Sequence, residues 1–213
     1  NDADMNPGIT RAVRQMTEQT DRMKSLVNDL LHLSKLESNN AGIGNDWFEF
    51  QPLCAVSVDQ LRAYTPVSLT GEKFPQAEIH CDCASNIEIL GFADEISSVL
   101  SNLITNAVKY GGKEGQAAQV GISIKTSALG LEVAISDKGD GIAANHLTRL
   151  TERFYRVDES RESTIGGSGL GLAIVRHALE HHDAQLKIES TLGKGSRFSF
   201  IIPAERIRIK GES

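Results

Sequence analysis

The chain has 213 residues, of which 40% are hydrophobic and only 5% aromatic. This length allows one domain of ordinary size with an appendage, and the composition predicts an aliphatic core. The formal net charge of −6 gives no reason to expect binding to nucleic acid or to an anionic membrane surface. No apolar run reaches the length of about 20 residues that a membrane-spanning helix needs.

The first predicted element is one long helix over residues 6–38. Its apolar residues recur at alternating spacings of four and three, the heptad pattern of helices that pack together. The members of this heptad seam are Ile9, Val13, Met16, Thr20, Met23, Val27 and Leu30. Such a stripe predicts packing in a helical bundle or a dimer. We expect a helical arm over residues 1–40 and a linker over residues 41–46.

Shorter elements follow the linker. They are a strand over 47–51, a helix from Pro52 to about residue 64, strands over 78–83 and 87–90, a helix over 93–110, strands over 120–126 and 131–136, a helix over 169–182, and strands over 185–191 and 196–202. Helices and hairpin strands are mixed without strict alternation. The predicted class is therefore α+β, as a two-layer α/β sandwich with a mixed sheet under helices. We expect it to cover residues 47–205, with a tail over residues 206–213.

Three polar residues share one face of the predicted helix over residues 93–110. Asn102, Asn106 and Lys109 are separated by four and three positions, opposite an apolar face. Carboxamide oxygens can ligate Mg²⁺, and an ammonium group can meet a phosphate. A solvated helix face explains the same pattern about equally well. Asparagine is a poor helix former, however, so two at this spacing need a reason.

Asp137 ends a predicted strand and is followed by Gly139 and Gly141. A buried carboxylate here can accept a hydrogen bond from the amino group of adenine, because the glycines let the backbone come close to the base. A plain Asp-Gly turn explains the local pattern at least as well. The glycine-rich segment over residues 137–168 is long and irregular, which is typical of a lid over a binding site.

A second glycine cluster over residues 166–171 opens an apolar helix, where free N–H groups can bind a phosphate. A flexible hinge is the alternative, and the two interpretations are compatible. The cluster is not a P-loop, because no Gly-Lys-Ser/Thr follows. It is not a dinucleotide fingerprint either, because no strand leads directly into it.

Together, these motifs resemble those of the sensor histidine kinases of two-component systems. Asn102-Leu-Ile-Thr-Asn106-Ala resembles the N box of that family, and Asp137-x-Gly139-x-Gly141 resembles the G1 box. The F box, the G2 box and the last glycine motif correspond to Arg153-Phe-Tyr-Arg156, Gly167-x-Gly169-x-Gly171 and Gly193-Lys-Gly-Ser-Arg-Phe198. The first helix resembles the second helix of the dimerisation and histidine-phosphotransfer domain. Within the family, residues 151–158 and 166–172 look most like the phosphate-regulon sensor kinases.

The resemblance covers nearly the whole chain and implies an ATP-binding fold of the GHKL, or Bergerat, type. Asn106 would ligate Mg²⁺, while Asn102, Lys109 and Arg156 would contact phosphates. Tyr110 would stack on or flank the adenine, and Asp137 would accept from its amino group. The remaining implied ATP-binding positions are Gly139, Gly141, Gly167, Gly169, Leu170 and Gly171.

The resemblance also implies ATP and Mg²⁺ as cofactors, and phosphoryl transfer to a histidine. The next acceptor would be an aspartate in the receiver domain of a response regulator. The full-length protein would be a homodimer, and this chain would be the cytoplasmic portion of a bacterial inner-membrane protein, without membrane contact of its own.

The chain departs from the family pattern in one respect. None of its six histidines stands in the His-Glu/Asp-Leu-Arg-Thr-Pro context of the family's phosphoacceptor, so no catalytic residue is assigned and the acceptor helix is expected upstream. One alternative is a hydrolysing ATPase of the same fold. Those enzymes carry a glutamate base at the position of Asn102, where an amide cannot serve. A second alternative is a nucleotide-binding module without kinase activity.

Overall fold

The computed structural model describes residues 7–38, 46–62, 77–82, 86–112, 117–157 and 168–210. Within these ranges the elements are α1 (Pro7–Ser38), β1 (Asp46–Glu49), α2 (Phe50–Arg62), β2 (Glu78–Asp82), β3 (Ile87–Gly91), α3 (Ala93–Tyr110), β4 (Gln119–Ser127), β5 (Gly130–Asp137), α4 (Ala144–Leu147), α6 (Gly171–Glu180), β6 (Lys187–Thr191), β7 (Gly195–Pro203), the 3-10 helix η1 (Ala204–Arg206) and β8 (Ile207–Ile209). Among the described helices, none is long and apolar enough to cross a membrane.

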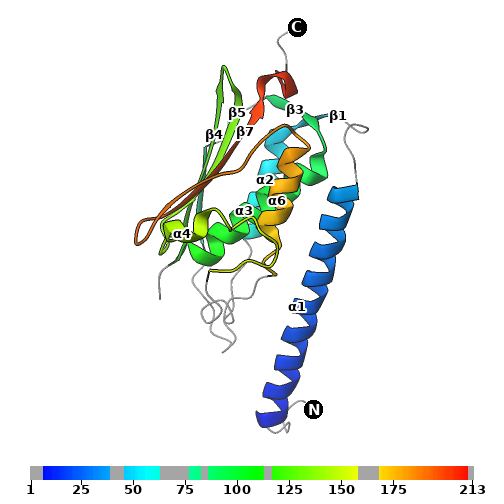
Figure 1. The fold of residues 1–213 in the computed structure, drawn as a ribbon, viewed down its shortest axis with the longest axis vertical. Helices are drawn as coiled ribbons and strands as arrows, with labels where there is room; N and C mark the ends of the chain where they lie inside the picture. Colours follow the sequence, from blue (N-terminus) through cyan, green and yellow to red (C-terminus); the bar gives the residue numbers. More distant parts are fainter. Residues whose placement is uncertain are drawn as a thin grey trace.

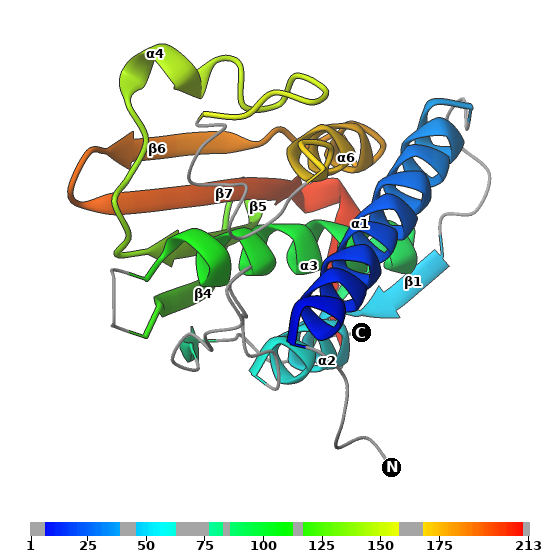
Figure 2. The same ribbon diagram turned by 90° about the horizontal axis from the view of Figure 1, so that it is seen from below.

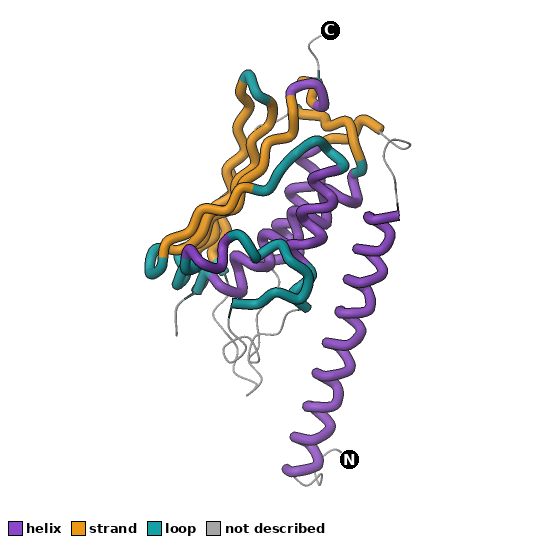
Figure 3. The backbone as a smooth tube through the Cα atoms, in the orientation of Figure 1, coloured by secondary structure: helices purple, strands orange, loops and turns teal. Residues whose placement is uncertain are grey.

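The main sheet has the strand order β2-β4-β5-β7-β6, and α2, α3 and α6 cover one of its faces (Figures 1 and 3). β2 and β4 are parallel, whereas the other neighbouring strands are antiparallel, so the sheet is mixed. The side chains of Leu131, Val133 and Ile135 on the central strand β5 are fully buried. The predicted two-layer α+β sandwich is therefore confirmed.

The helix α3 lies between α2 and α6 in the helical layer (Figure 2). Its bounds, Ala93–Tyr110, are those that the sequence predicts. The apolar residues recur every three or four positions, and those that are buried are Ile96, Val99, Leu100, Leu103, Ile104, Ala107 and Val108. Burying one large aliphatic side chain stabilises a fold by about 1.5–3 kcal/mol, so this face holds α3 firmly. The polar residues Asn102 and Asn106 remain half-buried.

The helix α2 begins at Phe50, two residues before the predicted start at Pro52. A proline is tolerated there because the N–H groups in the first turn of a helix have no acceptor within the helix. Phe50 is 1% exposed and belongs to the core, and this burial favours the earlier start. Residues 63 and 64, the predicted end of this helix, lie outside the described residues.

A small second sheet has the order β1-β3-β8 and includes the last described strand. Strand β8 pairs antiparallel with β3, matching Ile207 with Ile89 and Ile209 with Ile87. Arg208 forms an ion pair with Glu88, and its guanidinium carbon lies 4.2 Å from the ring centroid of Trp47. Residues 207–209, which lie within the predicted tail, thus pair as a strand with one edge of β3.

The last turns of the long helix α1 pack on α6 (Figures 1 and 2). Leu33 and Leu36 are 2% and 3% exposed. Glu37 forms ion pairs with Arg153 and with His177 of α6, the latter at 3.5 Å. By contrast, the apolar members of the heptad seam are all at least 41% exposed. The described part of this chain thus leaves the seam uncovered, so the predicted packing against other helices requires a partner.

A buried polar cluster joins the end of α6 to the start of α3. His182 is fully buried, its Nδ1 donates to the carbonyl of Ala178 at 2.7 Å, and its Nε2 accepts from the Phe92 N–H at 3.0 Å. These two bonds require the neutral imidazole with its proton on Nδ1. Glu95 lies beside it and pairs with His181 at 3.1 Å. Burial lowers the pKa of His182 below its ordinary value.

We expect folding stability to fall as the pH drops below about 6.5, the ordinary pKa of histidine. The folded pKa of His182 is lower than the unfolded pKa, so the unfolded chain binds a proton first. The stabilisation that the buried neutral His182 contributes is complete above a pH of about 6.5, and it is lost as the pH falls toward the pKa of the folded state. Urea midpoints between about pH 8 and pH 5 measure it. A His182→Phe variant should show a flatter profile, and an identical slope would exclude His182 as the cause.

Candidate nucleotide-binding site

The end of α3 lies against the loop that follows β5. A Cβ atom at Gly139 would lie 2.0 Å from the carbonyl oxygen of Tyr110, and one at Gly111 would lie 2.8 Å from the Cβ of Asp137. Only glycines permit so close an approach of two backbone segments. The structure therefore brings together Tyr110 and Asp137, which the sequence analysis assigned to the two sides of one pocket.

Asp137 is the last residue of the central strand, and two backbone groups orient its carboxylate. Its Oδ1 accepts hydrogen bonds from the N–H of Gly139 at 2.9 Å and of Ser196 at 3.3 Å. Burial raises the pKa of Asp137, while these two hydrogen bonds oppose the shift. With Oδ1 fixed in this way, Oδ2 is the oxygen that a ligand donor can approach.

The helices α3 and α6 meet at the start of α6. A Cβ atom at Gly171 would lie 2.6 Å from Oδ1 of Asn102, and the Nδ2 of Asn102 donates to the carbonyl of Ser98 at 2.9 Å. Asn102 is thus placed at a contact between helices as well as on the predicted polar face. The helix begins at Gly171, two residues later than predicted, and the buried Leu170 precedes it.

The predicted F box lies against the G2 segment. The Phe154 N–H donates to the carbonyl of Gly169 at 2.9 Å, and both residues have positive φ angles, 60° and 70°. Tyr155 shares a hydrogen bond of 2.6 Å with Nδ1 of His146, and the guanidinium carbon of Arg149 lies 4.2 Å from the centroid of its ring. Arg156 is half-buried in this segment, and its contact with phosphate stays a prediction. Gly167 lies outside the described residues.

The turn between β6 and β7 forms a further side of the site, to which the sequence analysis gave no role. Gly141 has a φ of 69°, and a Cβ there would lie 2.1 Å from the carbonyl oxygen of Thr191. The Gly193 N–H donates to the carbonyl of Asp140 at 2.7 Å. A Cβ at Gly195 would lie 2.1 Å from the carbonyl oxygen of Asp137. The glycine spacing in the last motif, which contains Ser196, was the only signal for these contacts, and nothing in the sequence pointed to Ser190.

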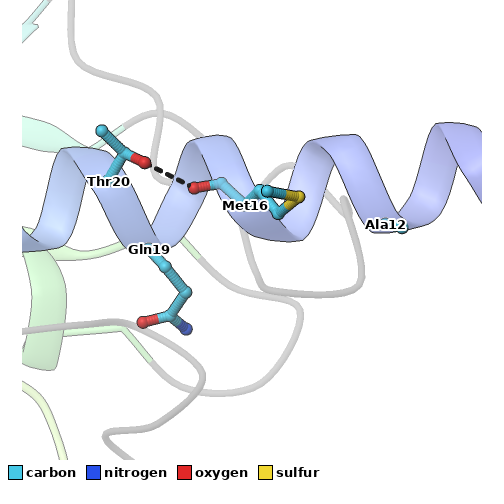
Figure 4. Close-up of a pocket in the computed structure, with 4 residues that line it drawn as sticks. All are labelled: Ala12, Met16, Gln19 and Thr20. Atoms are coloured by element: carbon cyan, nitrogen blue, oxygen red, sulfur yellow. Dashed lines mark hydrogen bonds between the residues drawn. The ribbon is translucent and has the colours of Figure 1, made fainter.

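A separate cavity of about 440 Å³ lies along α1, lined by Ala12, Met16, Gln19 and Thr20 (Figure 4). Met16 is 70% exposed, and the Thr20 hydroxyl donates to the carbonyl of Met16 at 2.8 Å. Among the described residues, those that line this cavity carry no charge that could bind a phosphate. This cavity is therefore a weaker candidate for nucleotide binding than the site between α3, β5 and α6.

The chemistry of that site suits a purine nucleotide. One end has the half-buried carboxylate of Asp137, whose Oδ2 makes no hydrogen bond to the described residues and can accept from an exocyclic amino group. The polar face of α3 contributes the amide of Asn106 and the ammonium of Lys109, and the first N–H groups of α6 start at Gly171. A base at Asp137 and phosphates near α3 and α6 would use all of these groups.

Comparison with known proteins agrees with this geometry. A sequence model of the family described as histidine kinase-, DNA gyrase B-, and HSP90-like ATPase matches residues 91–206. The chain is 41% identical over 196 residues to the phosphate regulon sensor protein PhoR of Pseudomonas aeruginosa, covering 92% of this chain and 42% of that protein. The corresponding protein of Haemophilus influenzae is 40% identical over 198 residues, covering 93% and 44%. The chain thus spans less than half the length of these relatives.

Solved structures give the same result for the fold. Full-length ShkA in complex with AMPPNP has a TM-score of 0.70 at 25% identity, over 94% of this chain and 40% of that chain. The mycobacterial sensor histidine kinase MprB has a TM-score of 0.62 at 21% identity, over 75% and 97%. Taken with the match to residues 91–206, these findings show that the chain belongs to the histidine kinase-, DNA gyrase B-, and HSP90-like ATPase family, as a histidine kinase catalytic domain similar to phosphate regulon sensor proteins.

Proposed function

We propose that the chain binds ATP together with Mg²⁺ and transfers the γ-phosphoryl group to a histidine on an acceptor helix that is not part of this sequence. The observation that carries the proposal is the fixed carboxylate of Asp137 at the end of α3, where Gly111 and Gly139 bring the two backbone segments together. The parent protein would then pass the phosphoryl group to the receiver domain of a response regulator.

The residues present fit both ATP and the metal ion. Asp137 would accept from the adenine amino group, and Tyr110 would flank the ring. Asn106 would hold Mg²⁺, and Lys109, Asn102 and Arg156 would bind phosphate oxygens. When bound, the metal ion would neutralise charge on those oxygens. The glycines at 139, 141, 169 and 171 would shape the pocket and the lid, and Gly167 and Leu170 would also bind ATP.

The contacts of α3 favour phosphoryl transfer over hydrolysis. Its two acidic residues, Asp94 and Glu95, both lie in the first turn, and Glu95 pairs with His181 at the far end of the helix from Asn106. A hydrolase needs a base that activates water near the phosphates, and the amide of Asn102 cannot remove a proton. The geometry therefore supports a kinase more than an ATPase.

Phosphorylation in trans tests the proposal. The chain is mixed with γ-labelled ATP, Mg²⁺ and a separately supplied dimerisation and histidine-phosphotransfer domain from its parent protein. We expect an acid-labile label on that domain, absent with Asn106→Ala and retained with His32→Ala, a histidine of α1 outside the site. Nucleotide binding without label would leave only a binding module. Steady hydrolysis that is lost with Asn106→Ala would support the ATPase.

The exposed heptad seam supports a homodimer in the full-length protein. Met16 and Met23 are 70% and 68% exposed, and an uncovered apolar stripe of this kind favours association with another helix. The parent protein would carry this chain on the cytoplasmic side of a bacterial inner membrane. Sedimentation of the full-length protein at several concentrations measures the association, and a strict monomer at all of them would contradict the dimer.

A further inference from the structure

Near the end of strand β6, the hydroxyl of Ser190 connects the two halves of the site. We propose that Ser190 is a positioning residue, which sets the Asp137 carboxylate for the 6-amino group of a purine and so contributes to selection of adenine. The inference rests on the proposed function, because it assumes that Asp137 meets the base.

The Ser190 hydroxyl acts both as a hydrogen-bond acceptor and as a donor. Its oxygen accepts from the Ile142 N–H at 2.8 Å, across 48 positions of sequence, and the same hydroxyl donates to the carbonyl of Gly195 at 2.9 Å. It also lies 3.0 Å from the hydroxyl oxygen of Ser196. One side chain therefore ties the loop after β5 to the start of β7.

Ser196 links these hydrogen bonds of Ser190 to the Asp137 carboxylate. The Ser196 N–H donates to Oδ1 of Asp137, and the Gly195 backbone lies against the carbonyl of Asp137. The Gly139 N–H meets the same oxygen from the other side of the loop. Because Ser190 holds both Ile142 and Gly195, it fixes the two segments whose N–H groups orient Asp137. Without this hydroxyl, the Asp137 side chain should lose its fixed orientation. Its Oδ2 would then no longer point steadily toward the 6-amino group of the base.

Calorimetric titration with two ligands separates this role from a general loss of structure. We expect Ser190→Ala to weaken ADP binding about five- to tenfold, the usual effect of one lost hydrogen bond. Binding of purine riboside diphosphate, which lacks the 6-amino group, should change less than about twofold. Ser190→Thr keeps the hydroxyl and should restore ADP binding. Ser190→Cys, which keeps the size of the side chain with a weak donor, replaces the alanine variant if that one does not fold.

A matched control and a double variant complete the experiment. Ser57→Ala removes a buried hydroxyl that donates to the carbonyl of Leu53 at 3.0 Å in α2, and it should leave ADP binding unchanged. In the Asp137→Asn background, Ser190→Ala should add less than about twofold. Equal losses for both ligands, unchanged ADP binding, or full additivity with Asp137→Asn would overturn the role of Ser190. If the parent chain does not bind ADP, or binds it independently of Asp137, the proposed function fails instead.

Discussion

Replacement of Gly139 by alanine is expected to reduce affinity for adenine nucleotides at least about a hundredfold, or about 2.8 kcal/mol. The added Cβ would lie 2.0 Å from the carbonyl oxygen of Tyr110 and 3.0 Å from the Cα of Gly111. These neighbours are backbone atoms, so no side-chain rotation can relieve the overlap. The loop after β5 must move away from α3, and Asp137 would lose its place beside Tyr110. Titration of the folded variant with ADP measures the loss.

Gly193→Ala is the matched control for this experiment. Gly193 has a φ of 76°, yet nothing lies within 4 Å of its Cβ position. Alanine there should cost about 1–2 kcal/mol of stability through the left-handed backbone conformation, with affinity within a few-fold of the parent. Circular dichroism and thermal melts establish that both variants are folded. Nucleotide affinity of Gly139→Ala within about threefold of the parent would contradict the close contact between α3 and the loop.

The second large effect concerns folding stability rather than binding. Gly91→Ala should lower the free energy of unfolding by about 2–3 kcal/mol, because its Cβ would lie 2.4 Å from Cδ2 and Nε2 of His182. That ring cannot easily turn aside, since Ala178 and Phe92 hold both of its nitrogens. Urea unfolding monitored by circular dichroism measures the change.

A double-variant cycle identifies the ring as the cause. His182→Ala alone should destabilise the fold, because it leaves the half-buried Phe92 N–H without its acceptor. In that background, Gly91→Ala should cost less than about 1 kcal/mol, since the atoms that it would meet are gone. The coupling between the two sites is then about 2 kcal/mol. Effects that add within about 0.5 kcal/mol would show that the strain lies elsewhere.

The sequence predicts best those elements whose residues form long periodic patterns. The bounds of α3 agree with the prediction because its buried residues repeat over about four turns of helix, so tertiary contacts and local pattern specify the same segment. The common site of the Asn102 helix and the glycine motifs was implied only by the family resemblance. Domain boundaries and the individual ligand contacts remain predictions.

Contacts between distant segments account for the differences. The earlier start of α2 depends on burial of Phe50, and β8 depends on a free edge of β3, neither of which a local pattern contains. The bond from Ile142 to Ser190 spans 48 positions, and that from Phe92 to His182 spans 90. Serine and histidine occur in too many settings for their roles to be recognised without the fold. The late start of α6 reflects Gly169, whose positive φ is not helical.

Calorimetric titration with a non-hydrolysable ATP analogue in the presence of Mg²⁺, on the parent chain and on Asp137→Asn, tests the central claim most directly. The account predicts binding to the parent and at least tenfold weaker binding to the variant, because an amide at this position presents an N–H where the carboxylate offers an acceptor. Equal affinity of the two proteins, or no binding to the parent, would contradict an adenine site built on Asp137.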